Sequence, residues 1–94
     1  MSYELEFVES ALKEWHKLSA GTRDQLKTKL AQRLETPRVP AARLHGMPDC
    51  YKIKLRTVGY RLVYQVQDER VVVVVIAVGR RDKGLVYLLA KKRV

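Results

Sequence analysis

The residues of this chain that could carry out chemistry stand in one short basic stretch. Lys52, Lys54 and Arg56 occupy alternate positions, and Arg61 follows after Val58-Gly59. Alternate residues of a strand point to the same face, so these cations should lie together. Several cations around a lysine lower its pKa and make it a better base near neutral pH. A cluster of this kind suits phosphodiester cleavage, in which negative charge develops on the phosphate oxygens.

One form of this reaction matches the side chains present. RNA can be cleaved through its own 2'-hydroxyl, which requires neither a water nucleophile nor a metal ion. The reaction needs a base for the 2'-hydroxyl, cations for the phosphate and a donor for the 5'-oxygen that leaves. Arginine serves as a cation more readily than as an acid, because its pKa stays above about 12. Positioning can supply about 7–11 kcal/mol of the barrier, so we expect a large scaffold to compensate for weak acid and base groups.

Other catalytic sites cannot be assembled from this sequence. His16, His45 and Cys50 supply its only imidazoles and thiol, and their spacing does not predict a metal site. The sequence contains neither a Gly-rich phosphate loop nor a Ser-His-Asp set. We therefore expect an enzyme that needs no metal and no other cofactor. The single cysteine forms no internal disulfide and suits the reducing cytoplasm.

The positive charge is unevenly distributed along the 94 residues, which are enough for one domain, 1–94. The net charge is +9, yet residues 1–36 carry six Lys or Arg and six Asp or Glu. The excess therefore lies from Pro37 onward, which points to nucleic acid or an acidic protein as the partner of that part. No membrane partner is expected, since no basic helix has the amphipathic character needed to bind a membrane surface. The longest apolar run, 71–78, has eight residues and is too short to span a bilayer.

Two strands are expected to carry the cations. The segment 51–66 reads YKIKLRTVGYRLVYQV and alternates apolar with basic or polar residues on both sides of Val58-Gly59. If these two residues form the loop of a hairpin, one face of both strands is apolar and the other is cationic. Two arginines opposed on that face repel each other unless an anion lies between them. On the cationic side this register pairs Arg56 with Arg61, Lys54 with Val63 and Lys52 with Gln65.

The remaining pattern predicts an α+β fold of order β-α-α-β-β-β-α. We expect a mainly antiparallel, twisted sheet with a helical hairpin on one face and a C-terminal helix. A capping box that begins at Thr22 should start the second helix, and Thr36-Pro37 should end it. The connector 37–49 should be anchored by Leu44 and Met47. The other expected elements are a strand at 3–7, a helix at 10–18, a strand at 71–78 with both faces covered, and a helix at 85–94.

Several stretches of this sequence resemble the RelE family of bacterial toxins. They are ALKEWHKL, LHGMPDCYKIKLR, GYRLVYQV, and VGRRD followed by a tyrosine five residues later. The resemblance extends over nearly the whole chain, from residue 3 to residue 81. It implies a fold of the RelE and barnase-like microbial ribonuclease type, and a toxin that cuts mRNA in the ribosomal A site. It also implies mRNA on the ribosome, ribosomal RNA and an acidic RelB-like antitoxin as partners, the antitoxin carrying the pair to operator DNA.

The resemblance also implies a role for each residue of the site. Lys54 matches the candidate base for the 2'-hydroxyl, and Arg81 matches the residue assigned to the leaving group. Lys52 and Arg61 would stabilise the charge of the transition state, while Tyr87 would stack on the mRNA. Further contacts with RNA are expected from Arg43, His45, Arg56, Arg80 and Lys83.

Two features differ from the family pattern and leave alternatives open. His45 stands where close relatives carry an arginine that grips RNA, and the segment 84–90 is unusually apolar. Tyr87 has an alternative place, packed under the last helix, and we expect an antitoxin helix to displace that helix. The same basic sheet would also suit a non-catalytic RNA- or antitoxin-binding module. The full cation set on one face favours the enzyme, since backbone tracking tolerates displaced charges.

Overall fold

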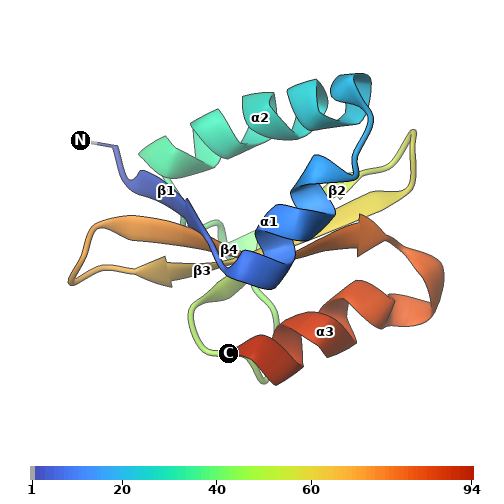
Figure 1. Ribbon diagram of the computed structural model, residues 1–94. Helices are drawn as coiled ribbons and strands as arrows, with labels where there is room; N and C mark the ends of the chain where they lie inside the picture. Colours follow the sequence, from blue (N-terminus) through green and yellow to red (C-terminus); the bar gives the residue numbers. More distant parts are fainter. Residues whose placement is uncertain (1) are drawn as a thin grey trace.

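The computed structural model describes residues 2–94, except for the side chain of Lys83. Within these residues a four-stranded sheet lies between helix α2 on one face and helix α3 on the other (Figure 1). The elements are β1 (Glu4–Phe7), α1 (Glu9–His16), α2 (Ala20–Glu35), β2 (Cys50–Leu55), β3 (Tyr60–Gln67), β4 (Val72–Arg80) and α3 (Leu85–Arg93), with short 3-10 helices at Pro40–Ala42 and Asp82–Gly84. This confirms the predicted α+β fold and its β-α-α-β-β-β-α order.

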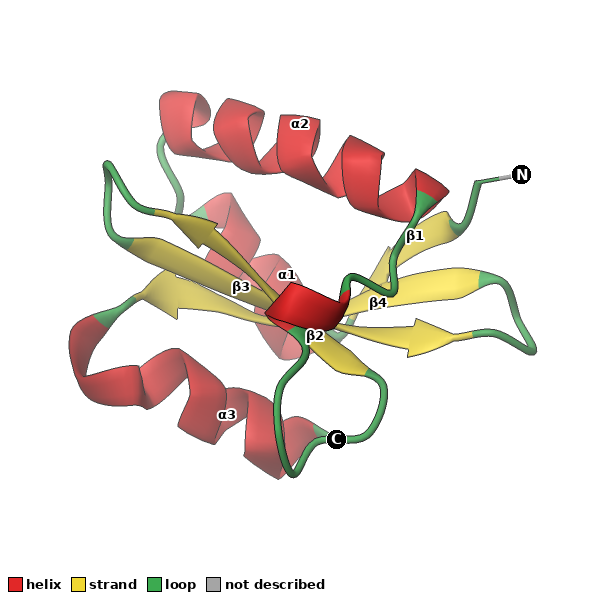
Figure 2. Cartoon of the chain, turned by 180° about the vertical axis from the view of Figure 1, so that it is seen from behind, coloured by secondary structure: helices red, strands yellow, loops and turns green. Residues whose placement is uncertain are grey.

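The sheet is mixed and mainly antiparallel, as expected. Its strand order is β1-β4-β3-β2, in which β1 runs parallel to β4 and the other neighbours are antiparallel. Strand β2, which carries Lys52 and Lys54, is therefore an edge strand, while β4 is internal. Figure 2 shows the same layers from behind. No helix of residues 2–94 is long and apolar enough to cross a membrane.

Two buried clusters, one on each face, hold the sheet between the helices. The strand β4 is apolar on both sides because it contributes to both clusters, as predicted. The first cluster joins Ala11, Trp15, Leu26 and Leu30 of α1 and α2 to Ile53, Leu62, Tyr64, Val73 and Val75. The second joins Val86 and Ala90 of α3 to Val63, Val72, Val74, Ile76 and Ala77. Met47 is buried in this second cluster and Leu44 packs against it, which confirms the predicted anchors of the connector.

The second helix begins earlier than the predicted capping box at Thr22. Ser19 is the N-cap, and its Oγ accepts a hydrogen bond from the Thr22 backbone N–H at 3.3 Å. Serine is as good an N-cap as threonine, so residues 19–21, which lie between the two predicted helices, form the cap and the start of α2 instead. The helix consequently has 16 residues and runs past the edge strand β2.

The register of the β2–β3 hairpin differs from the prediction by two residues. Lys54 faces Arg61 and Lys52 faces Val63, so the predicted pairing of Arg56 with Arg61 is wrong. The connection is the four-residue loop 56–59, in which only Gly59 has a positive φ (66°). A two-residue loop of the common hairpin type would also require a positive φ at the β-branched Val58. A shift of two residues keeps every side chain on its predicted face, because the side-chain period of a strand is two.

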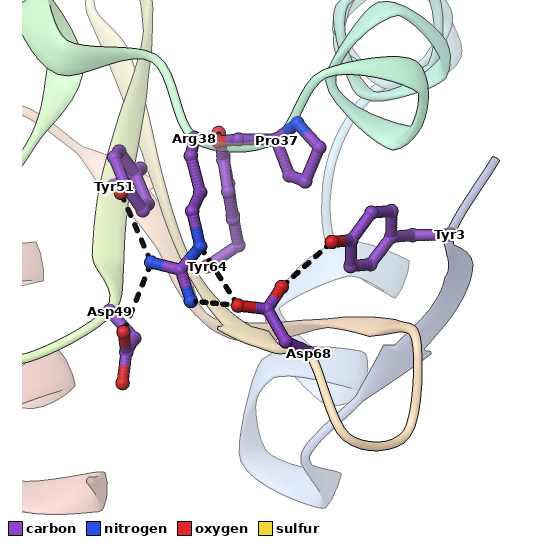
Figure 3. Close-up of polar contacts among 7 residues, drawn as sticks. All are labelled: Tyr3, Pro37, Arg38, Asp49, Tyr51, Tyr64 and Asp68. Atoms are coloured by element: carbon purple, nitrogen blue, oxygen red, sulfur yellow. Dashed lines mark hydrogen bonds and ion pairs between the residues drawn. The ribbon is translucent and has the colours of Figure 1, made fainter. Parts of the chain in front are cut away.

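A network of side chains fastens the connector 37–49 to the far end of the sheet (Figure 3). The Arg38 guanidinium donates to Asp49 at 3.0 Å, to Asp68 at 2.8 Å and to the Tyr51 hydroxyl at 3.3 Å. The Tyr3 hydroxyl donates to the other oxygen of Asp68 at 2.7 Å. The Tyr3 hydroxyl and the Arg38 charge hold the pKa of the Asp68 carboxyl below its usual range. Exposed pairs of this kind add little stability, so we infer that the network serves mainly to orient the start of β2.

Candidate active site

Three cations meet on the face of the sheet that α3 partly covers. Lys54 lies directly opposite Arg61, at a Cβ separation of about 4.5–5.5 Å for such pairs. Lys52 lies two residues along β2, roughly 7 Å from Lys54. Lys52 faces Val63, which is buried under α3, so all three side chains share the α3 face. They stand beyond the cover of the helix, since Lys54 is exposed and the other two are half-buried.

The charges around Lys54 alter its protonation. The charge of Lys52 lowers the pKa of Lys54, followed by desolvation and the charges of Arg61 and Arg56. No ion pair found in residues 2–94 includes Lys52, Lys54 or Arg61, so no carboxylate offsets this repulsion. Lys54 is therefore neutral at lower pH than an ordinary lysine, which is the property that a general base requires.

Arg81 and Tyr87 approach this face from the segment after β4. Arg61 pairs with Gly79, and the Arg81 backbone N–H donates to the Gly59 carbonyl at 2.9 Å, which brings Arg81 beside the hairpin loop. The Arg81 side chain is exposed. Tyr87 lies on α3, half-buried against the second cluster, as the alternative prediction for this residue describes. The structure thus brings Arg81 to the cations and holds the Tyr87 ring against the core.

Most of the additional RNA contacts expected from the sequence lie elsewhere. Arg80 pairs with Tyr60, and its guanidinium carbon lies 5.8 Å from the centre of that ring, on the face opposite Lys54. Arg43 and His45 are exposed residues of the connector, near the Cys50 end of β2. That end lies roughly 13 Å from Lys54 along the strand. Arg56 does join the cluster, and the side chain of Lys83 lies outside the described residues.

Sequence reasoning missed two cations that α2 places next to β2. Arg33 donates from Nη1 to the Lys52 carbonyl at 3.1 Å and to the Tyr64 hydroxyl at 2.9 Å. Lys29, one turn earlier, faces Lys54 and Arg56 across a hollow. The spacing of four residues does predict that Lys29 and Arg33 share a helix face. The approach of that face to β2 has no signal in the sequence.

The remaining groups that can carry chemistry are placed unfavourably for it. Cys50 is fully buried, and burial raises the pKa of its thiol to about 11, so it is not a thiolate nucleophile. Within residues 2–94, no three side chains of His, Cys, Asp or Glu are grouped so that they could hold a metal ion. The chemistry available at this site is therefore that of Lys54 and the arginines around it.

Comparisons with known proteins give a consistent result over the full length of the chain. The mRNA interferase toxin RelE of Escherichia coli K12 is 62% identical over 94 residues, which cover 100% of this chain and 99% of the relative. The mRNA interferase RelE of Shigella flexneri matches with the same identity and coverage. The family described as ParE toxin of type II toxin-antitoxin system, parDE, matches residues 5–84.

Solved structures support the same assignment. A mutant of the E. coli toxin RelE in the free state superposes with a TM-score of 0.93 at 61% identity, covering 100% of this chain and 99% of the other. The toxin chain of the intact E. coli RelBE toxin-antitoxin complex superposes with a TM-score of 0.84 at 62% identity, covering 87% of this chain and 100% of the other. This chain therefore belongs to the RelE family of mRNA interferases, the toxins of type II toxin–antitoxin systems.

Proposed function

We propose that this protein cleaves mRNA in the ribosomal A site through attack of the message's own 2'-hydroxyl on the adjacent phosphate. The observation that carries the proposal is the grouping of Lys52, Arg61 and Arg56 around Lys54 on an open sheet face without a carboxylate partner, which lowers the pKa of Lys54. A lysine whose pKa is lowered by neighbouring cations is suited to act as a base, whereas backbone tracking requires only positive charge and tolerates displaced charges. The substrate places the reaction in the cytoplasm, where ribosomes translate.

Each residue of the site has a role in this reaction. Neutral Lys54 removes the proton of the 2'-hydroxyl, whose oxygen attacks phosphorus, and the bond from phosphorus to the 5'-oxygen breaks. Lys52 and Arg61 stabilise the charge on the phosphate oxygens, and Arg81 hydrogen-bonds to the 5'-oxygen, which takes up a proton from water as it leaves. The products are a 2',3'-cyclic phosphate and a 5'-hydroxyl. Tyr87 stacks on the message once α3 has moved its ring away from the second cluster.

The open geometry of the site explains why cleavage should depend on the ribosome. The hairpin presents its cations on an open sheet face, and arginine gives up a proton too reluctantly to be a good general acid. The ribosome would hold the codon in line for attack, which is worth several orders of magnitude in rate.

We expect the purified protein to cut ribosome-bound message at least about 100-fold faster than the same RNA free in solution. Single-turnover cleavage of one labelled message, with and without programmed ribosomes, measures this ratio. Equal rates on the two substrates would contradict the ribosome-dependent mechanism. Tight binding to ribosomes without cleavage would instead identify a non-catalytic RNA-binding module.

The same proposal includes an acidic antitoxin that docks where α3 now packs. Relatives of this chain form complexes with the antitoxin RelB, and the sheet face beneath α3 is apolar. Hydrogen bonds from Arg93 hold the end of α3 in place. The Arg93 guanidinium donates to both carboxylate oxygens of Glu14 at 2.9 and 3.0 Å and to the Ile76 carbonyl at 2.9 Å. Both side chains of the pair are only about one-fifth exposed. These hydrogen bonds of Arg93 must break if an antitoxin helix is to replace α3.

Replacing Arg93 by methionine should therefore tighten the binding of an acidic antitoxin helix several-fold, because less free energy is then required to displace α3. Calorimetric titration of the variant and of the wild type with the same antitoxin peptide measures the change. Lys92→Met is the matched control, since Lys92 is an exposed cation on the same helix. Weaker binding by Arg93→Met than by Lys92→Met would show that α3 forms part of the docking surface.

A further inference from the structure

A basic groove runs along the free edge of the sheet, between α2 and β2. Two adjoining hollows of about 330 and 300 Å³ share Lys54 and Arg56 and together form this groove. Gln25, Lys29 and Arg33 line its helix side, and Lys52, Lys54 and Arg56 line its strand side.

The lining of the groove carries charge of one sign. Five of the six polar residues named are cations, and no Asp or Glu is among the described residues that line either hollow. None of the five takes part in an ion pair within residues 2–94. A concave surface lined by cations without carboxylate partners has a strongly positive electrostatic potential. This potential favours the binding of a polyanion.

The backbone of the strand edge argues against a peptide as the occupant. An added strand would need the outward carbonyl groups of β2 as hydrogen-bond acceptors. Arg33 already donates to the Lys52 carbonyl at 3.1 Å and is itself held by the Tyr64 hydroxyl at 2.9 Å. The Arg33 side chain therefore lies across the edge of β2 and blocks the addition of a strand, while its positive charge remains at the groove. A ligand that binds through anionic groups can occupy the groove while Arg33 stays in this position.

We propose that the α2–β2 groove binds the phosphodiester backbone of an RNA strand beside the site of cleavage. The inference rests on the proposed function, because Lys52 and Lys54 line both the groove and the catalytic face. The strand side spans Lys52 to Arg56, roughly 13 Å. Phosphates of one strand of a duplex are about 3.4 Å apart along the axis, so more than one can contact a groove of this length. Lys29 and Arg33 are the contributions of α2 to that contact.

The test compares two charge reversals on the same helix. Lys29→Glu changes the groove, while Lys27→Glu changes an exposed lysine that does not line it. Two residues turn an α-helix by about 200°, so the control lies on the opposite side. Binding is measured on ribosomes programmed with a message that carries a 2'-deoxy nucleotide at the cut, so the readout does not require cleavage. Thermal unfolding of both variants confirms that they fold equally well.

We expect Lys29→Glu to weaken binding about tenfold and to reduce the slope of log affinity against log salt by about 1, as for one lost phosphate contact. Lys27→Glu should change the affinity by less than about twofold. Equal losses in both variants would show general charge steering and overturn the proposal, and so would unchanged affinity in Lys29→Glu. Absence of cleavage by the wild type on an all-ribose message would overturn the proposed function and leave this comparison intact.

A second arm identifies which RNA strand lies in the groove. The two variants are compared again on ribosomes whose message ends close to the cut codon on either side. A Lys29→Glu defect that disappears with the shortened message assigns the groove to mRNA. A defect that persists assigns it to ribosomal RNA. Both results support an RNA backbone as the occupant and differ only in its source.

Discussion

Replacing Lys54 by alanine should lower the single-turnover rate of cleavage on the ribosome about 100-fold or more, the usual effect of removing a general base. Affinity for the ribosome should change much less, because Lys52, Arg61 and Arg56 still carry the charge of the site. Lys91→Ala, which removes an exposed cation from α3, serves as the control for loss of charge. A Lys54→Ala protein that cuts at the wild-type rate would remove Lys54 from the mechanism.

The pH dependence of the rate tests the same assignment in a second way. The lowered pKa of Lys54 means that the rate should rise with pH over a range below that of an ordinary lysine, as the protonated amine loses its proton. Lys52→Met should move this rise to higher pH, because the charge of Lys52 is the largest cause of the lowered pKa. Arg81→Ala should lower the rate and leave the rise in place, since Arg81 does not lose a proton. Persistence of the rise in Lys54→Ala would assign it to another group.

A 2'-deoxy nucleotide at the attacked position should abolish cleavage altogether. The 2'-oxygen is the nucleophile of the proposed reaction, and Cys50, the chain's only thiol, is buried with a pKa raised to about 11. Messages with ribose throughout should yield fragments that end in a 2',3'-cyclic phosphate, which mass spectrometry detects directly. A deoxy substitution one nucleotide away from the cut is the matched control and should leave the rate within about twofold, because no bond changes there.

Cleavage of the 2'-deoxy message would contradict the proposed nucleophile. If the deoxy-substituted message is cut at an undiminished rate, water is the nucleophile, and a lysine that activates the 2'-hydroxyl has no function. The role of Lys54 would then fall, while membership of the mRNA interferase family would stand on its own comparisons.

The hairpin shows how far local rules reach in this protein. The alternation along β2 was enough to predict that Lys52 and Lys54 share one face and that the other face is apolar, because successive side chains of a strand point in opposite directions. The register was predicted wrongly by two residues, since it depends on which residues of the loop can adopt a positive φ. This error changed the partner of Lys54 from Val63 to Arg61, which is one of the charges that lower its pKa.

The positions of the charged side chains in space could not be predicted from local rules. Arg80 and Arg81 are neighbours in the sequence, yet β4 places the first beside Tyr60 on the face of α1 and leaves the second beside Gly59. Residues 1–36 carry balanced charge, which concealed that one face of α2 is basic where it meets β2. A count of charged residues along the sequence does not separate the faces of a helix, so it does not show that one face of α2 is basic.

By itself the sequence determined the order of the elements, the two faces of the hairpin and the family, because these depend on spacing within a few residues and on long identical stretches. Only the tertiary structure decided that Arg61 lies directly opposite Lys54, that Arg33 spans the free edge of β2, and that the Tyr87 ring of α3 packs against the second cluster. Electrostatic coupling depends on distance through space. Packing sets the distance between α2 and β2, where the contacting residues Arg33 and Lys52 are 19 apart in the sequence, so no spacing rule could have supplied it.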